Sequence, residues 1–258
     1  MTTPTDKPVA LVTGGGSGIG AAIAKRLSRD HTVVICGRRL DPLAAVAADI
    51  GGLALQCDLG DAGETAALPQ RIIAQLGRLD TLILNAGIVA PSPVAEMPLA
   101  DWDRQLMVNL TSPFILTQAA LPFLLPRRGK IVGIASAAAH ATGMGLAAYS
   151  ASKAGLIRLI QSVAFENARH GLRANAISPG WVRTEMGDME MAELGGSADE
   201  GYAQVTRHVP LRRAAHADEI AGVVAFLLSD DASFMNGSVV AVDGGSRIVD
   251  PGMLAFDA

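Results

Sequence analysis

The stretch Thr13-Gly-Gly-Gly-Ser-Gly-Ile-Gly20 decides the fold, because it joins the apolar run Val9–Val12 to an amphipathic segment. A glycine-rich turn between a strand and a helix is the context in which backbone amides and the helix dipole bind phosphate groups. A side chain at such a glycine would collide with the approaching anion. The sequence therefore predicts a dinucleotide phosphate loop, with the binding residues Gly14, Ser17, Gly18, Ile19 and Gly20.

Outward from this loop, short apolar runs alternate with helical patterns along most of the chain. The expected strands are Pro8–Thr13, Thr32–Cys36, Leu53–Gln56, Thr81–Leu84, Lys130–Ala135, Arg173–Ile177 and Ser238–Val242. The expected helices are Gly18–Arg29, Pro42–Asp49, Ala62–Leu76, Ala100–Leu125, Leu146–Arg169 and His216–Leu228. Continuously apolar strand runs are typical of parallel strands covered on both faces. The predicted fold class is α/β, a doubly wound parallel sheet of the Rossmann type with helices on both faces and ligands beyond the carboxyl ends of the strands.

The length of 258 residues is usual for one α/β domain, and we expect a single dinucleotide-binding domain over residues 1–258. The stretch Gly187–Val209 interrupts the alternation and is rich in Met, Glu, Gly and Asp. A long, weakly structured insertion in a compact domain predicts a substrate lid. The formal net charge of −4, without a long basic run, argues against a nucleic-acid partner.

The remaining composition indicates a cytoplasmic protein. Leu106–Pro126 is the most apolar stretch, but polar residues and prolines interrupt it, so we expect a buried helix and no membrane association. The N-terminal residues do not resemble a signal peptide. Cys36 and Cys57, the only cysteines, are expected to be reduced and buried. None of the five histidines has the spacing of metal ligands, and we expect no catalytic metal.

The end of the second expected strand bears on the choice between NADP and NAD. Proteins of this fold that bind NAD carry an acidic residue there, which accepts hydrogen bonds from the ribose 2′-hydroxyl. This position is Gly37, followed by Arg38 and Arg39. A guanidinium binds a 2′-phosphate through a fork of hydrogen bonds, so Arg38, with Arg39 as a possible helper, favours NADP(H) over NAD(H). At the next strand end, Asp58 and Leu59 are expected to meet the adenine ring.

Tyr149 and Lys153 are four residues apart on one expected helix, and Ser136 precedes Tyr149 by thirteen residues. Residues four apart share a helix face. A phenol has a pKa of about 10, so proton exchange near neutrality requires a nearby positive charge that stabilises the phenolate. We therefore expect Tyr149 to act as general acid in ketone reduction and as general base in alcohol oxidation. The Ser136 hydroxyl would donate a hydrogen bond to the substrate oxygen.

With these motifs, the chain resembles the short-chain dehydrogenase/reductase family, in its branch of about 250-residue oxidoreductases, from about Pro8 to Gly245. The landmarks are the phosphate loop, Asp58, Asn85-Ala86-Gly87, Asn109, Ser136, Tyr149-x-x-x-Lys153, Pro179-Gly180 and Asp243-Gly244-Gly245. One departure is Leu84, where the family often has a first Asn before Asn85. The turn at this strand end is nevertheless expected to survive.

The resemblance implies further roles. Tyr149 and Lys153 would also contact the cofactor, Lys153 by holding the nicotinamide ribose hydroxyls. Asn109 would hold a water molecule in a proton relay to Lys153. Asn85, Ala86 and Gly87 would form the turn beside the cofactor. The segment that meets the nicotinamide carboxamide would include Pro179, Gly180, Val182 and Thr184. The resemblance also implies a homotetramer, built on the long helices Ala100–Leu125 and Leu146–Arg169 and on the last helix and strand, His216–Val242. The tail Arg247–Ala258 is apolar enough to pack, and the sequence leaves open whether it contributes to a neighbouring subunit.

Three functional interpretations remain. The leading one is an NAD(P)-dependent oxidoreductase that interconverts a secondary alcohol and a ketone. The second is the same fold dedicated to 3-oxoacyl groups on an acyl carrier protein, which basic residues gathered at the pocket mouth would favour. The candidates for that surface are Arg127, Arg128, Lys130, Arg169 and Arg173. The third is a catalytically idle regulator that senses a dinucleotide. The substrate would be bordered by His140, Met144, Leu146, Trp181 and the lid.

Overall fold

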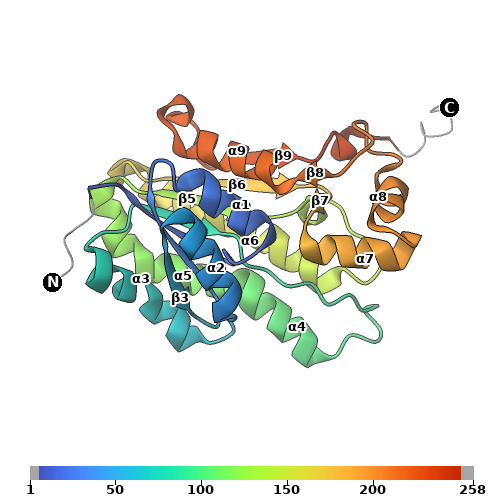
Figure 1. Ribbon diagram of the computed structural model, residues 1–258, viewed down its shortest axis with the longest axis horizontal. Helices are drawn as coiled ribbons and strands as arrows, with labels where there is room; N and C mark the ends of the chain where they lie inside the picture. The colour runs from blue at the N-terminus through green and yellow to red at the C-terminus, as the bar shows by residue number, and fades with distance from the viewer. Residues whose placement is uncertain (1–5, 251–258) are drawn as a thin grey trace.

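In the computed structural model, which describes residues 6–250, seven parallel strands form one sheet in the order β3-β2-β1-β4-β5-β6-β9 (Figure 1). The strands are β1 Val9–Thr13, β2 Thr32–Gly37, β3 Leu53–Gln56, β4 Thr81–Leu84, β5 Lys130–Ile134, β6 Arg173–Pro179 and β9 Val239–Val242. The order reverses between β1 and β4, so a crevice opens where their carboxyl ends diverge. The prediction of a doubly wound parallel sheet is confirmed, with each strand within two residues of its expected bounds.

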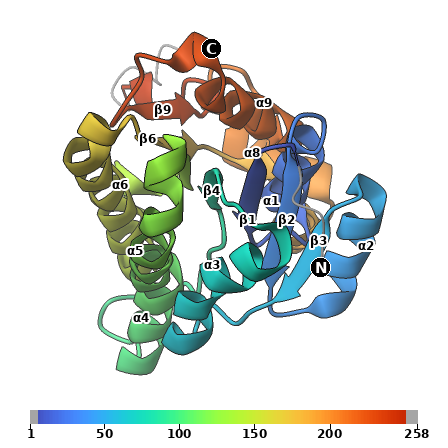
Figure 2. The ribbon, with the colours of Figure 1, turned by 90° about the vertical axis from the view of Figure 1, so that its left-hand side faces the viewer.

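Two layers of helices cover the sheet, one on each face (Figure 2). On one face α3, α5 and α6 bury side chains such as Leu68, Leu116 and Leu156 against the strands. On the other face α1, α2 and α9 bury side chains such as Ile23 and Val224. The helices are α1 Gly18–Leu27, α2 Leu40–Ile50, α3 Ala62–Leu76, α4 Leu99–Leu106, α5 Ser112–Leu124, α6 Ala147–Asn167, α7 Glu185–Gly195, α8 Ala198–Thr206 and α9 Ala217–Leu228. The continuous apolar runs of the central strands follow from this double coverage, because both faces are buried.

The expected helix Ala100–Leu125 is not regular along its length. It consists of α4 and α5 joined by a π-helical turn at Met107–Thr111, which contains the fully buried Asn109. By length and composition alone, Leu99–Arg127 could cross a membrane. In the fold its α5 part packs against α3 and β4 and buries Leu116 in the core. This segment is therefore a core helix of the layered domain, as the sequence predicted.

The expectation of a weakly structured stretch at Gly187–Val209 was wrong. Most of it is helical: α7 and α8 pack against each other and begin at the capping hydroxyls of Thr184 and Ser197. Each hydroxyl accepts a hydrogen bond from a backbone amide three residues on, which stabilises a helix start. The strand pair β7 Val182–Arg183 and β8 Ala215–His216 lies at the base of this insertion. Short helices with a mixed polar pattern escaped the sequence interpretation because their apolar face is narrow.

Both cysteines are buried and unpaired, as expected. Cys36 lies on β2 and its carbonyl oxygen accepts hydrogen bonds from the amides of Gly14 and Gly15, so the second strand helps to shape the phosphate loop. Burial raises the pKa of the Cys57 thiol to about 11, which makes it unreactive near neutrality. Of the expected packing tail 247–258, residues 251–258 lie outside the described residues.

Candidate active site

The loop after β1 has the backbone geometry that a phosphate cradle requires. Gly14 and Gly18 have φ of +67° and +53°, a region that residues with a side chain rarely adopt. A Cβ on Gly20 would lie only 2.1 Å from the carbonyl oxygen of Gly14, so only glycine fits this close turn. Ser17 precedes α1, and its hydroxyl makes no capping hydrogen bond to that helix. The loop therefore presents backbone amides and an unused hydroxyl at a helix N-terminus.

Thr13 and Asn85 tie the phosphate loop to the end of β4. The Thr13 hydroxyl accepts hydrogen bonds from the amides of Asn85 and Ala86 at 2.9 and 3.0 Å. The Asn85 side-chain amide in turn donates to the Thr13 carbonyl oxygen at 2.8 Å. Leu84 is buried in the core at the position where the family often has Asn. The strand-end turn is thus intact, because its hydrogen bonds come from Asn85 and Thr13.

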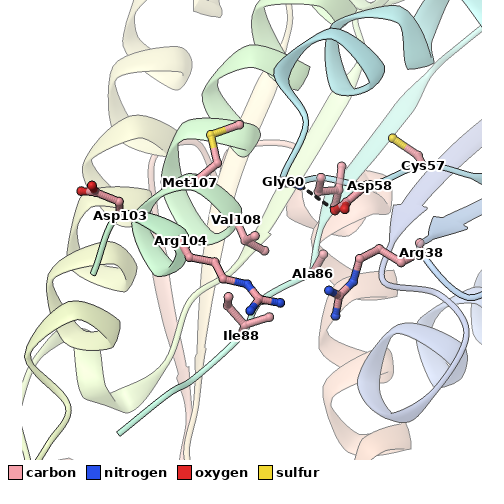
Figure 3. Close-up of a pocket in the computed structure, with 13 residues that line it drawn as sticks. Arg38, Cys57, Asp58, Gly60, Ala86, Ile88, Asp103, Arg104, Met107 and Val108 are labelled. Carbon is pink, nitrogen blue, oxygen red and sulfur yellow. Dashed lines mark hydrogen bonds between the residues drawn. The ribbon is translucent and has the colours of Figure 1, made fainter. Parts of the chain in front are cut away.

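A cavity of about 430 Å³ opens beside this turn, at the carboxyl ends of β2, β3 and β4 (Figure 3). Thirteen residues line it: Gly37, Arg38, Cys57, Asp58, Leu59, Gly60, Ala86, Gly87, Ile88, Asp103, Arg104, Met107 and Val108. Five of the residues predicted from sequence are among them, and they arrive from three separate strand ends. The cavity lies where an open α/β sheet places its ligand, at the point where the strand order reverses.

Arg38 is exposed at the cavity, and its guanidinium points into it (Figure 3). Gly37 places no carboxylate at the end of β2, so nothing at that position would repel a phosphate. Asp58 uses one carboxylate oxygen to accept a hydrogen bond from the amide of Gly60 at 2.8 Å. Arg39 is exposed as the residue preceding α2 and is absent from the cavity lining. Its role as a helper of Arg38 stays a prediction.

Ser136, Tyr149 and Lys153 lie together at the carboxyl end of β5. Ser136 is the second residue after the strand, and its hydroxyl interacts with the phenol of Tyr149. The Lys153 ammonium lies 5.7 Å from the centre of the Tyr149 ring and donates a hydrogen bond to the carbonyl oxygen of Ile134 at 2.9 Å. A Cβ on Gly87 would lie 3.1 Å from the Lys153 nitrogen. The Gly87 wall of the cavity therefore lies beside the Lys153 ammonium.

Burial moves the pKa values of Lys153 and Tyr149 apart, because it lowers that of the lysine and raises that of the tyrosine. Burial lowers the pKa of Lys153, which is 3% exposed, to about 8. Burial also raises the pKa of the Tyr149 phenol, and the hydrogen bond with Ser136 opposes that rise. Both shifts have the same origin, since a less polar environment disfavours the charged form of either group. Perturbed pKa values beside a cavity are characteristic of catalytic sites.

Asn109 connects three parts of the site from within the π-helical turn. Its side-chain oxygen accepts a hydrogen bond from the Ile88 amide at 2.8 Å, and its nitrogen donates to the Ile88 carbonyl and the Ser152 hydroxyl. Both amide hydrogens are therefore used, while the oxygen has one further acceptor position. Such turns occur often at functional sites because they reorient a side chain. The proposed contact of Asn109 with a relay water stays a prediction.

The end of β6 brings the segment expected at the nicotinamide to the phosphate loop. The methyl carbon of Thr184 lies 3.1 Å from the position of a Cβ on Gly18. The Thr184 hydroxyl accepts a hydrogen bond from the amide of Gly187 and keeps its own hydrogen available. Pro179 is buried, and the amide of Gly180 donates to the carbonyl oxygen of Val242. Val182, on β7, is half-buried.

The residues that α4 and the following π-helical turn contribute to the cavity were not predicted: Asp103, Arg104, Met107 and Val108. Arg104 and Val108 are four residues apart and so share a helix face, but this spacing does not reveal that the face turns toward the cavity. Ile88 and Gly60, beyond the ends of β4 and β3, were also missed.

Among the residues bordering the expected substrate region, the His140 ring nitrogen lies 3.0 Å from the hydroxyl of the buried Ser178. Met144 and Trp181 are exposed. Within residues 6–250, no group of three His, Cys, Asp or Glu side chains is arranged to hold a metal ion.

The basic residues considered for a carrier protein lie away from this site. Lys130 and Arg173 begin the paired strands β5 and β6, so they stand at the amino edge of the sheet. Lys130 donates to the carbonyl oxygen of Leu228, and Arg173 to those of Ser229 and Met235. Arg127, Arg128 and Arg169 immediately precede the same strands. They do not gather at the mouth of the cavity, which opens at the opposite edge.

The fold and site define a class of protein, the nicotinamide-dependent oxidoreductases that pair a phosphate loop with a tyrosine and a lysine. The family model described as enoyl-(acyl carrier protein) reductase matches residues 14–247. Protein MoaE of Klebsiella aerogenes is 40% identical over 96% of this chain and 98% of its own length. D-threitol dehydrogenase of Mycolicibacterium smegmatis is 36% identical, over 94% of each chain. The structure of the actinorhodin polyketide ketoreductase with NADPH has a TM-score of 0.88 at 32% identity, covering 95% of this chain and 99% of the other.

The chain belongs to the short-chain dehydrogenase/reductase family. It is an oxidoreductase acting on CH–OH and carbonyl groups with a nicotinamide dinucleotide. Its residues fit that cofactor, because the glycines of the phosphate loop leave room that a Cβ would fill, and Gly87, which lines the neighbouring cavity, lies beside Lys153.

Proposed function

We propose that the protein interconverts a secondary alcohol and a ketone with NADP(H), using Tyr149 as the group that exchanges the proton. The observation that supports this most is the placement of Lys153 beside Gly87 of the cavity wall and 5.7 Å from the centre of the Tyr149 ring. The bound nicotinamide would supply or accept the hydride. Adenosine would occupy the cavity between Asp58 and Ala86, and the phosphates would lie on the amides of the loop after β1.

The chain's own residues divide the remaining chemistry. Ser136 would donate a hydrogen bond to the substrate oxygen and hold it beside the phenol, where charge develops during the reaction. Tyr149 would give its proton to that oxygen in reduction and take it back in oxidation. Lys153 would stabilise the phenolate, offsetting the rise in pKa that burial imposes on Tyr149. Thr184 would orient the carboxamide of the cofactor.

Initial rates with a panel of carbonyl substrates test this function. The panel contains simple and cyclic ketones, ketoses and short 3-oxoacyl thioesters, each with NADPH and NADH, and secondary alcohols with the oxidised cofactors. We expect turnover of at least one ketone class, faster with NADPH. Cofactor binding without turnover of any member would contradict the proposal and favour an idle, dinucleotide-sensing regulator. Turnover confined to thioesters would favour the acyl reductase, although the basic residues do not lie at the cavity mouth.

Arg38→Asp should weaken NADPH binding by about 100-fold, because a forked charge-assisted contact is replaced by repulsion. NADH carries no 2′-phosphate, so its dissociation constant should change less than about threefold. Titration of the quenching of protein fluorescence measures both constants. Arg29→Asp is the matched control, since this exposed arginine beyond α1 is outside the cavity lining. Equal weakening of both cofactors by Arg38→Asp would show that Arg38 does not contact the 2′-phosphate.

The helices α7 and α8 are proposed to form a substrate lid. Arg183 at their base pairs with the carboxylates of Asp188 and Asp199 and lies 4.8 Å from the centre of the Tyr202 ring. The Tyr202 hydroxyl donates to the carbonyl oxygen of Val182 at 3.3 Å. Arg183 therefore neutralises part of the negative charge of this segment.

We further propose a cytoplasmic homotetramer. Large apolar side chains are exposed on the elements expected to form interfaces, including Phe114 on α5, Phe165 on α6 at 87% and Phe234 before the edge strand β9. Exposed aromatic side chains and a sheet edge favour association. The buried, unpaired cysteines fit a reducing compartment. Sedimentation at micromolar concentration should give four times the chain mass of 26.6 kDa, and a monomer would contradict the assembly.

A further inference from the structure

A second arginine, Arg104 on α4, faces Arg38 across the cavity. Both side chains belong to the lining, and Arg104 comes from the wall opposite the end of β2. In Figure 3 the two guanidinium groups extend toward each other, and Ala86 and Ile88 lie beside them. The sequence interpretation assigned a function to Arg38 alone.

Neither guanidinium is neutralised by a neighbour. Within residues 6–250, no hydrogen bond or ion pair of the Arg38 or Arg104 side chain is found. Asp58 directs one oxygen to the Gly60 amide, and the carboxylate of Asp103 points away from the cavity (Figure 3). Two like charges that face each other repel, and an anion bound between them converts this repulsion into two attractive contacts. The pair is therefore a site for a compact anion with a high charge.

The helix holds Arg104 in this direction. Its neighbour Gln105 is buried and is anchored to the loop after β4, accepting a hydrogen bond from the Ala90 amide at 3.1 Å and donating to the Ala90 carbonyl at 3.2 Å. Since adjacent helical residues point about 100° apart, fixing Gln105 inward turns Arg104 toward the cavity. Val108, one turn further on, lines the same wall. Arg104 thus occupies a rigid element, which reduces the entropy lost on binding.

We propose that Arg104 is the second cationic ligand of the cofactor's 2′-phosphate and, with Arg38, sets the preference for NADP(H) over NAD(H). The inference rests on the proposed NADP(H)-dependent function. A phosphomonoester carries a charge of about −1.5 to −2 at pH 7 and three acceptor oxygens, so it matches two guanidinium groups better than one. Arg38 contacts it from the ribose side, and Arg104 closes over it from α4.

The test compares wild type, Arg104→Gln, Arg38→Gln and the double variant in fluorescence titrations with NADPH and NADH. Arg104→Gln should weaken NADPH about tenfold, the loss expected for one hydrogen bond between charged groups, and NADH less than twofold. Competition by adenosine 2′,5′-bisphosphate should weaken in the same way, while competition by 5′-AMP should not. The double variant should lose the preference for NADPH over NADH. The effects of the two single substitutions should be non-additive, because the two side chains share one ligand. Arg29→Gln, which removes an exposed charge at the end of α1, is the control and should change neither constant.

Two results would overturn the assignment. Equal weakening of NADPH and NADH binding by Arg104→Gln would show that Arg104 contacts the pyrophosphate or acts through long-range electrostatics. Unchanged NADPH binding would show that Arg104 does not contact the cofactor. Glutamine is a good helix former and position 104 is exposed, so the variant should keep the wild-type melting temperature. Wild-type preference for NADH would contradict the proposed NADP(H) dependence. In that case, a lower ratio of NADPH to NADH affinity in Arg104→Gln would still support Arg104 as a ligand of the 2′-phosphate.

Discussion

Tyr149→Phe is expected to lower kcat/KM at least about 1,000-fold in both reaction directions while changing the NADPH dissociation constant less than twofold. The reason is that phenylalanine keeps the ring packed beside Lys153 but removes the only atom that exchanges the proton. The substrate oxygen would still meet Ser136, so the loss is one of chemistry and not of binding. Single-turnover rates with NADPH bound in advance measure the chemical step directly.

Tyr202→Phe is the matched control, because the chain has two tyrosines and the hydroxyl of this one donates to the carbonyl oxygen of Val182, away from Lys153. It should reduce turnover far less than Tyr149→Phe does. Retained activity in Tyr149→Phe, within tenfold of wild type, would refute the assignment of the general acid and base. A loss of NADPH affinity matching the loss of rate would instead give Tyr149 a role mainly in cofactor binding.

The sheet was predictable because its strands carry their own signal. Runs such as Val9–Val12 and Val33–Cys36 are apolar at every position, and each is followed by a glycine at the turn. The π-helical turn at Met107–Thr111 was not predictable, because a single wider turn changes the hydrophobic period too little to be seen among apolar residues. In the α7–α8 segment, the capping residues Thr184 and Ser197 could be recognised in the sequence, but short polar helices have a weak periodic signal.

The same distinction applies to the site. Cavity residues at strand ends, such as Arg38, Asp58 and Ala86, could be predicted because parallel strands bring their carboxyl ends to one edge of the sheet. Arg104 could not, because its contribution depends on which face of α4 turns toward the cavity. That face is set by the tertiary contact of Gln105 with Ala90, which sequence spacing alone does not reveal. Site residues at strand ends are thus easier to predict from the sequence than site residues that a helix contributes.

Lys153→Met should be as stable as wild type or more stable, although it removes a buried side chain that makes a hydrogen bond. The folded-state pKa of about 8 lies below the unfolded value of about 10.4, so the unfolded chain binds the lysine proton more tightly. Burial of the ammonium therefore opposes folding at neutral pH. This destabilisation decreases as the pH rises from about 8 to about 10.4. Methionine has a similar volume and carries no charge whose burial opposes folding. The midpoint of urea unfolding at pH 7 measures the effect.

The same Lys153→Met variant should lose about 100-fold to 1,000-fold in turnover, and its pH dependence should identify the cause. A unit charge 5.7 Å from the phenol ring stabilises a phenolate by about 3 kcal/mol at an effective dielectric constant of about 20. Its removal should raise the apparent pKa of Tyr149 in alcohol oxidation by about 2 units, so the variant needs a higher pH to recover activity. An unchanged pH profile with reduced activity would show that Lys153 acts through the ribose alone. In the double variant with Tyr149→Phe, the two losses should be strongly non-additive, because the charge of Lys153 has little left to stabilise once the phenol is absent.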